Sequence, residues 1–274
     1  MTTDPLPRRY VLASVGTLVL ALLATVVGLF VPGFYRDAPP LLPQAYGQDL
    51  LTLVFAIPAL AVSLFYSREG SLRAYVVWLG VTGYILYTYA SYAFMTAFNE
   101  LYLVYTTLLW LSLYAFVGGF LNLDPEILAD QLGEVTRWPY VAFQLLLVLL
   151  VGFLWLSEIV PAILTGTVPP TVAEADLPTS VIYSLDLGII LPAFLISAYW
   201  LWKRRAWGYA LTAVLLVKVA TLGGAVLAMA YFMMQAGQPV PLPMVVIFAF
   251  LTVGALLLFG RYLWSIRPAS PASP

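Results

Sequence analysis

Long apolar stretches alternate along the chain with short links that are polar or rich in proline. A helix needs about 20 consecutive apolar residues to cross a bilayer, and eight stretches approach or exceed that length. They are residues 10–31, 49–66, 72–95, 101–121, 139–164, 180–202, 207–233 and 241–264. The pattern therefore predicts an all-α integral membrane protein with eight transmembrane helices.

The two halves of the chain resemble each other. The segment Ala45-Tyr46-Gly47-Gln48-Asp49-Leu50 reappears as Ile182-Tyr183-Ser184-Leu185-Asp186-Leu187, and residues 57–75 align without gaps on residues 191–209. Each half holds four predicted helices, so both halves enter the membrane from the same side. We therefore expect two parallel four-helix repeats, related by an axis along the membrane normal as in some transporters.

The links divide the chain into four parts. We expect a first repeat at 1–121, a linker at 122–138, a second repeat at 139–267 and a disordered tail at 268–274 that is short and rich in Ala, Ser and Pro. Within the linker, Asp124-Pro125-Glu126 followed by apolar residues predicts a short amphipathic helix.

Basic residues fix the expected orientation, because cytoplasmic links carry an excess of Lys and Arg. Leaving aside Lys218, which lies inside a predicted helix, ten positive residues fall on one side of the predicted helices, and Arg36 alone falls on the other. Those on the shared side are Arg8, Arg9, Arg68, Arg73, Arg137, Lys203, Arg204, Arg205, Arg261 and Arg267. Both termini are therefore predicted to lie in the cytoplasm, and the protein to lie in the cell (cytoplasmic) membrane.

Composition excludes many activities. Hydrophobic residues make up 62% of the 274 residues, charged residues only 9%, and mean hydropathy is +0.95. The net charge is −1 and the positive residues are scattered, so no nucleic-acid surface is expected. The chain has no Cys and no His, which removes thiolate nucleophiles and most haem and zinc ligands. We expect no metal and no cofactor, and no catalytic constellation is visible.

Lys218 is the residue with the strongest functional signal. It lies near the middle of an apolar stretch, where a lysine costs about 2.5 to 3.5 kcal/mol to insert. In the alignment of the two halves it falls opposite Tyr84, so the charge belongs to one half only. Proton coupling or capture of an anion would explain it. A structural salt bridge, or a lysine that reaches a water pocket, is the alternative.

Three carboxylates lie within the predicted helices, and two of them are assigned to the site of Lys218. Glu158 lies well inside the fifth predicted helix, and its counterpart in the first half is Leu29, so we predict that it pairs with Lys218, through a bridging water if helix tilt does not close the gap. Asp186 follows several apolar residues and is predicted to belong to the site. Asp49 is interpreted instead as capping the start of the second helix, where negative charge complements the helix dipole.

Hydroxyl groups gather on one face of the third predicted helix. Tyr84, Tyr87, Thr88 and Ser91 follow the i, i+3, i+4, i+7 spacing of a single face. We assign the deeper Tyr84 and Thr88 to a ligand pocket. Tyr residues nearer the helix end are expected to lie in the interfacial aromatic belt.

Two patterns carry a resemblance to a known group. They are Tyr87-x-Tyr89-x-x-Tyr92-x-Phe94-x-x-x-Phe98-Asn99, and Asp186-Leu187 through Pro192 to Trp207-Gly208-Tyr209 and Lys218. With them the chain resembles a group of uncharacterised prokaryotic eight-span membrane proteins. The resemblance implies a shared eight-span fold and carries over no activity. A lysine in a penultimate helix would also suit a retinal protein, but the span count and the four-plus-four repeat argue against that class.

The leading hypothesis is a secondary transporter or permease for a small molecule. Its site would lie between the repeats and be built from Lys218, Glu158, Asp186, Tyr84 and Thr88. The alternative is a membrane module that senses a ligand or assembles with a partner without transporting. A lipid-modifying enzyme ranks third, because intramembrane chemistry without His, Cys or paired carboxylates would depend on Lys218, Glu158 and the tyrosines.

Overall fold

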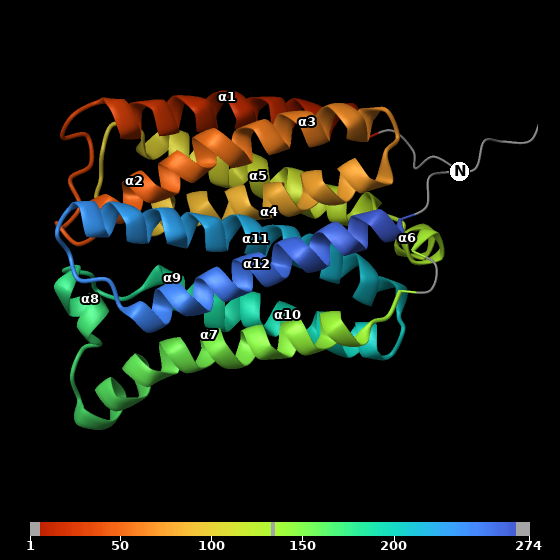
Figure 1. Ribbon diagram of the computed structural model, residues 1–274. Coiled ribbons are helices and arrows are strands. Elements are labelled where there is room, and N and C mark those ends of the chain that lie inside the picture. Colours follow the sequence, from red (N-terminus) through yellow and green to blue (C-terminus); the bar gives the residue numbers. More distant parts are fainter. Residues whose placement is uncertain (1–5, 133–134, 267–274) are drawn as a thin grey trace, which may run out of the picture.

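The protein is a bundle of long apolar helices. The computed structural model describes residues 6–132 and 135–266, and within them it contains helices and no strand (Figure 1). Seven helices of this part are long and apolar enough to cross a membrane: α1 (Arg8–Phe30), the continuous α2–η1–α3 (Leu42–Arg68), α5 (Tyr102–Asn122), α7 (Trp138–Thr165), the continuous α9–η2–α10 (Val181–Trp202), α11 (Ala206–Gln235) and α12 (Leu242–Ser265). The prediction of an all-α, multi-pass membrane protein is confirmed.

The remaining predicted segment also forms a helix, α4 (Leu72–Met95), but α4 is not among those seven. Ser71 caps the start of α4, because its side-chain oxygen accepts a hydrogen bond from the Ala74 N–H at 3.3 Å. Its many Tyr and Thr residues make it more polar than its neighbours, and 16 of its 24 residues are buried. It packs against α3, α5 and α11. The polar side chains of α4 are therefore placed against protein.

The start of the second span differs from the prediction. Helix α2 (Leu42–Leu51) begins with Pro43 in its first turn, a position where the missing N–H costs nothing. Asp49 therefore lies at the eighth residue of the helix, buried, and is too far from the N-terminus to cap it. The interpretation of Asp49 as a helix cap was wrong, because the polar residues before it were taken for a link.

Two wide turns interrupt the helical hydrogen bonding. The N–H of Ile57 bonds to the carbonyl of Thr52, and that of Leu191 bonds to the carbonyl of Asp186, each spanning five residues instead of four. These π turns, η1 (Thr52–Ala56) and η2 (Asp186–Ile190), lead into α3 (Ile57–Arg68) and α10 (Leu191–Trp202), each of which has a proline as its second residue. Proline has no N–H to donate, so an α-helical bond is missing at the same place.

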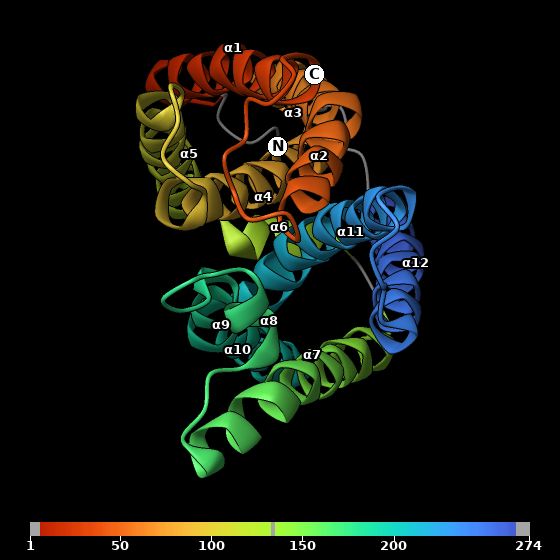
Figure 2. The same cartoon turned by 90° about the vertical axis from the view of Figure 1, so that its left-hand side faces the viewer.

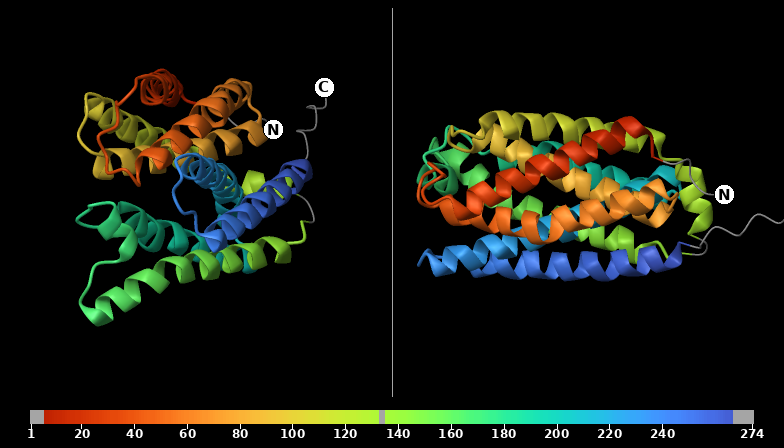
Figure 3. Two further views of the ribbon diagram at one scale, coloured as in Figure 1. Left: turned by 60° about the vertical axis from the view of Figure 1, so that its left-hand side comes forward. Right: turned by 90° about the horizontal axis from the view of Figure 1, so that it is seen from above.

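The helices fall into two groups that meet along α11. Figures 2 and 3 show α1 to α5 on one side and α7, α9, α10 and α12 on the other. Helix α11 packs against α2 and α4 of the first group and against α10 and α12 of the second. Glycines allow the closest approach: a Cβ on Gly47 would meet the Met229 backbone N at 2.3 Å, and one on Gly80 would meet the Val217 Cβ at 2.4 Å. Helix α11 is therefore the shared centre of the bundle.

Short helices close the two ends of the bundle. At one end lie the start of α1 and α6 (Pro125–Gln131), in which Asp124 accepts hydrogen bonds from the N–H groups of Glu126 and Ile127. We call it the basic end, because it carries the nine described basic residues that the sequence placed on one side. The other end, which carries Arg36 and α8 (Pro170–Glu174), is called the Arg36 end. The predicted tail at 268–274, and Arg267, lie outside the described residues.

Candidate functional site

Lys218 is buried at the middle of the central helix. It is the thirteenth residue of α11, about 18 Å from the start of that helix at 1.5 Å per residue, and its exposed fraction is 4%. Its nitrogen lies over the ring of Tyr87 from α4, 4.0 Å from the ring centroid. The negative face of an aromatic ring attracts an ammonium group, by about 2 kcal/mol or more when water is absent. The charge is thus turned toward protein.

Asp186 lies beside Lys218 and is held by two aromatic donors. Its Oδ1 accepts a hydrogen bond from the Tyr87 hydroxyl at 2.9 Å, and its Oδ2 accepts one from the indole N–H of Trp155 at 2.9 Å. The carboxylate opens the π turn η2, which sets it at the junction of α9 (Val181–Leu185) and α10. Tyr87 therefore contacts both charges, and it joins the two helix groups at this point.

A small cavity borders both charged residues. Its volume is about 30 Å³, enough for about two water molecules. Besides Lys218 and Asp186 it is lined by apolar side chains of α7, α10, α11 and α12, among them Phe194 and Leu222. Lys218 interacts electrostatically with Asp186, yet among the described residues the only ion pair within 4.0 Å is Arg36–Glu100. Both residues thus border a space of water size whose wall is mostly apolar, and they make no direct ion pair with each other.

Glu158 is placed away from Lys218. It lies twenty residues after the start of α7, about 30 Å along that helix, so it is roughly 12 Å nearer the Arg36 end than Lys218. There it accepts hydrogen bonds from the hydroxyls of Thr171 at 2.5 Å and Tyr183 at 2.9 Å. Its link to the cavity is indirect, through the Tyr183 ring, which packs on Trp155 at 5.2 Å. In this structure Glu158 ties α7 to α8 and α9.

Tyr84 and Thr88 form a separate cluster in the first helix group. The side-chain amide of Gln48 donates to the Tyr84 hydroxyl at 2.9 Å and to the Thr88 hydroxyl at 2.6 Å. Thr52, at the start of η1, shares a hydrogen bond of 2.9 Å with Tyr84. These residues are buried, and they face α2 and not the Lys218 cavity. The structure therefore brings together Lys218 and Asp186, but not Glu158, Tyr84 or Thr88.

Three residues of these clusters had been passed over. Tyr87 was named on the hydroxyl-bearing face of the third predicted helix but was not assigned to the site, because spacing within one helix does not show which neighbouring helix a side chain meets. Trp155 and Gln48 give no sequence signal, because an indole or amide in an apolar stretch is recognised as a donor only when its acceptor is known. Contacts between distant helices decide these roles.

A larger groove lies between the two helix groups at the Arg36 end. Its volume is about 550 Å³, and it is lined by α2, the loop before it and the end of α11. Tyr46 and Phe232 both line it and pack on each other, with ring centroids 6.1 Å apart. The Gln238 amide donates to the carbonyl of Pro39 at 2.9 Å and ties the two groups there. The lining carries no charged side chain, so the groove suits an apolar or neutral group.

Two loops at the Arg36 end contain ionisable groups whose pKa is shifted by their surroundings. Burial raises the pKa of Asp37, although its Oδ1 accepts a hydrogen bond from the Ala97 N–H at 2.8 Å. A hydrogen bond from its own backbone N–H, and then the nearby charge of Arg36, lower the pKa of Glu100. Burial and the charge of Asp49 raise the pKa of Tyr35, which keeps its hydroxyl protonated.

The groups around the Lys218 cavity can hold charge and protons. Within the described residues no group of three or more carboxylates comes together. Comparison with protein-family models, curated proteins and solved structures finds no significant match to this chain. The resemblance to uncharacterised eight-span proteins therefore stays a prediction, and function has to be argued from the Lys218 cavity itself.

Proposed function

We propose that the protein is a secondary transporter or permease for a small molecule, with Lys218 and Asp186 as the pair that exchanges charge or protons. The observation that carries the proposal is the buried pair itself, which lies beside a cavity of water size in the middle of the bundle and makes no direct ion pair. An intramembrane ion pair serving stability alone gains most by direct contact, because desolvation is costly. Because Lys218 and Asp186 make no direct ion pair, both groups remain able to accept another partner.

The membrane topology that we propose has eight crossings. Helix α4 runs alongside its neighbours, and at 24 residues it would span about 36 Å at 1.5 Å per residue. Its polar residues are covered by α3, α5 and α11, which removes the cost of exposing them to lipid. The excess of Lys and Arg assigns the basic end, and with it both termini, to the cytoplasm of a cell whose cytoplasmic membrane holds the protein.

We also propose that the two helix groups are duplicated halves. The pairs η1 and η2, α3 and α10, and α4 and α11 each begin 134 residues apart, at 52 and 186, 57 and 191, and 72 and 206. With the same offset, Thr52 and Tyr84 correspond to Asp186 and Lys218. The match of Asp49 to Asp186 in the sequence pattern has an offset of 137 residues instead, so these two aspartates do not correspond in the helix register. The hydrogen-bonded pair of the first half thus matches the charged pair of the second, which supports a site acquired by one half.

Cysteine labelling tests the proposal without knowledge of the substrate, because the chain has no native cysteine. Leu222→Cys places a thiol in the cavity wall. In vesicles of known orientation, a transporter that alternates between two open states exposes this thiol to a membrane-impermeant thiol reagent from either side. Labelling from one side only, or from neither, would contradict alternating access.

Matched variants make the labelling interpretable. Glu174→Cys, exposed on α8, and Lys203→Cys, exposed after α10, report each end of the bundle. Lys218→Met in the Leu222→Cys background should reduce labelling from at least one side, whereas Lys203→Met should not. The chain has only these two lysines, so the comparison separates the buried charge from the mere loss of a lysine.

One observation favours a non-transporting module as the second candidate. Helix α11 contacts the first group through glycines that bring backbone against backbone or side chain, as at Gly47 and Gly80. A central helix held rigidly against its neighbours suits a sensor or an assembly partner. In that case the Leu222→Cys thiol would stay unlabelled from both sides while the variant remained folded.

A further inference from the structure

A second buried carboxylate, Asp49, lies in the first helix group and has no part in the Lys218 cavity. Its exposed fraction is 2%. Its Oδ2 accepts a hydrogen bond of 2.5 Å from the Tyr35 hydroxyl, and its Oδ1 accepts one of 3.0 Å from the Tyr92 hydroxyl. Gly28 of α1 packs directly on this group, since a Cβ there would meet the Asp49 Oδ2 at 2.1 Å and the Tyr35 hydroxyl at 2.4 Å. The packing is built around the carboxylate.

Asp49 differs from Asp186 in its electrostatic surroundings. Asp186 has Lys218 beside the same cavity, but within the described part of the chain no Lys or Arg forms an ion pair with Asp49. The ionisable side chains that interact with it all belong to tyrosines: Tyr35, Tyr84, Tyr89, Tyr92 and Tyr105. An ionised carboxylate that is buried without a positive partner carries a large desolvation cost. Such a group therefore takes up a proton or pairs with a cation.

An unsatisfied hydroxyl group points to a further ligand. The Tyr89 hydroxyl is buried and has no hydrogen-bond partner among the described residues. The Tyr105 hydroxyl is also buried, and it interacts with the side chains of Asn99 and Tyr35. Tyr89 and Tyr105 both interact electrostatically with Asp49. The Tyr92 hydroxyl also lies 3.3 Å from the carbonyl oxygen of Ala45. Carboxylate, hydroxyl and carbonyl oxygens are the donors that hard cations prefer.

The size of the ligand is limited by the rings around it. Tyr92 packs on Tyr105 with centroids 5.2 Å apart and on Tyr35 at 6.2 Å, and Tyr89 lies 6.2 Å from Tyr105. Rings at these separations are in mutual contact. They leave no space for an organic ammonium between them, so the partner of Asp49 must be small.

We propose that Asp49, with the surrounding tyrosine hydroxyls, forms a second site that binds a small monovalent cation, either a proton or Na⁺. The site is separate from Lys218 and does not rest on the proposed transport function. A proton would sit on the carboxyl group itself. Na⁺ would be held by the Asp49 carboxylate, the hydroxyl oxygens and the Ala45 carbonyl.

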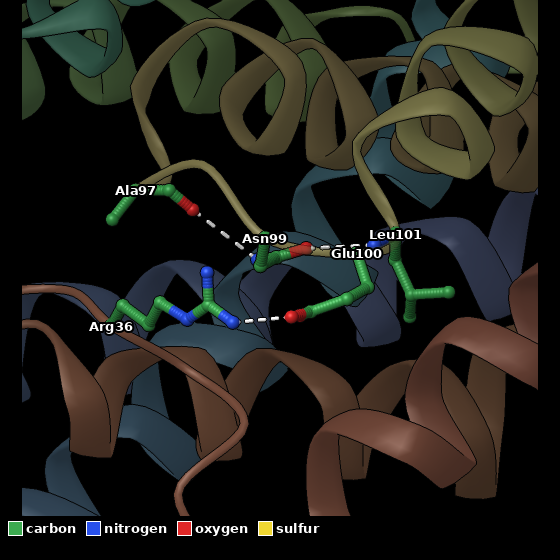
Figure 4. A network of polar contacts seen from close by, with 5 residues as sticks. All are labelled: Arg36, Ala97, Asn99, Glu100 and Leu101. Atoms are coloured by element: carbon green, nitrogen blue, oxygen red, sulfur yellow. Dashed lines mark hydrogen bonds and ion pairs between the residues drawn. The ribbon is translucent and has the colours of Figure 1, made fainter.

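The site is closed at the Arg36 end by Tyr35, and neighbouring residues hold that tyrosine in place. Arg36 forms an ion pair with Glu100 in the loop between α4 and α5, and Figure 4 shows the same loop braced by hydrogen bonds of Asn99 with Ala97 and Leu101. Asp37 accepts a hydrogen bond from the Ala97 N–H. A cation from the Arg36 end therefore reaches Asp49 when Tyr35 moves aside.

Two measurements on the purified protein in lipid nanodiscs distinguish the cations. Infrared difference spectra between wild type and Asp49→Asn at neutral pH report a protonated carboxyl group, whose carbonyl band disappears in the variant. Thermal unfolding in NaCl and in N-methyl-D-glucamine chloride of equal ionic strength reports Na⁺, which raises the midpoint temperature of the wild type but not of Asp49→Asn. Asp176→Asn, an exposed carboxylate at the same end, should behave as the wild type in both.

Either positive result identifies the cation and supports the site. If Asp49→Asn does not fold, Tyr35→Phe provides the comparison, because it keeps the ring and removes one hydroxyl. It should then shift the carboxyl band or weaken the Na⁺ response. An ionised Asp49 at neutral pH together with no specific effect of Na⁺ would overturn the proposal.

Discussion

The nitrogen of Lys218 and the ring of Tyr87 are 4.0 Å apart and join the two helix groups at the centre of the bundle. The hydroxyl of the same ring donates to Asp186 at 2.9 Å. The Tyr87 side chain therefore stabilises the Lys218 ammonium group through its ring face and the Asp186 carboxylate through its hydroxyl. The two contributions can be separated by substitution.

Tyr87→Phe should destabilise the protein moderately, because it leaves one oxygen of the buried Asp186 without its donor. The expected loss is about 1 to 3 kcal/mol in the free energy of unfolding. Tyr87→Leu should cost more, since it also removes the ring beneath Lys218. Thermal unfolding followed by Trp fluorescence measures both variants. Equal midpoints for Tyr87→Phe and the wild type would show that the hydroxyl contact is not made.

Removing one charge of the central pair should cost more than removing both. Lys218→Met and Asp186→Asn each leave an uncompensated buried charge, a change that typically costs about 3 to 5 kcal/mol when ion pairs are broken. The double variant should recover part of that loss. A double-mutant cycle on thermal stability measures the coupling, with Lys203→Met as the exposed control. Additive effects would mean that the two groups do not interact.

Gly47→Ala should force α2 away from α11, because the added Cβ would lie 2.3 Å from the Met229 backbone N, which cannot rotate away. Overpacking of this kind costs about 1 to 3 kcal/mol or more. Gly260→Ala in α12 is the matched control, since a Cβ there meets nothing within 4 Å. Comparison of their unfolding temperatures tests the close approach, and an unchanged Gly47→Ala variant would refute it.

Asp37 should make the loop at the Arg36 end sensitive to pH. Burial raises its pKa in the folded protein above the ordinary 3.8, so its contribution to stability is greatest below that value and is lost as pH rises through the folded pKa. Asp37→Asn keeps an acceptor for the Ala97 N–H and removes the charge. It should be more stable than the wild type at pH 7 and match it at pH 4. Thermal unfolding at the two pH values tests this, and a wild type that is more stable at pH 7 would reverse the sign.

The apolar pattern was enough to predict helices and membrane class, because lipid-facing helices need a long apolar segment whatever their neighbours are. The pattern gave a wrong interpretation at Asp49, because the polar first turns of α2 were taken for a link between helices. The site depends on contacts that no local pattern contains. Lys218 was recognisable by its depth, but the donor Trp155 and the placement of Glu158 follow from how α7 lies beside α9. Tyr84 and Thr88 were expected in the same pocket, yet their helix face turns to Gln48.

The glycine contacts of α11 limit how the cavity can open. Where Gly47 and Gly80 bring α11 against α2 and α4, sliding would drive main-chain atoms into each other. The far wall of the cavity is made by α7, α10 and α12, which pack through larger apolar side chains. A hinge motion that admits solvent to Lys218 must therefore displace these three helices while α11 stays fixed to the first group. Such a motion is asymmetric, because the first helix group stays in place and only helices of the second group move.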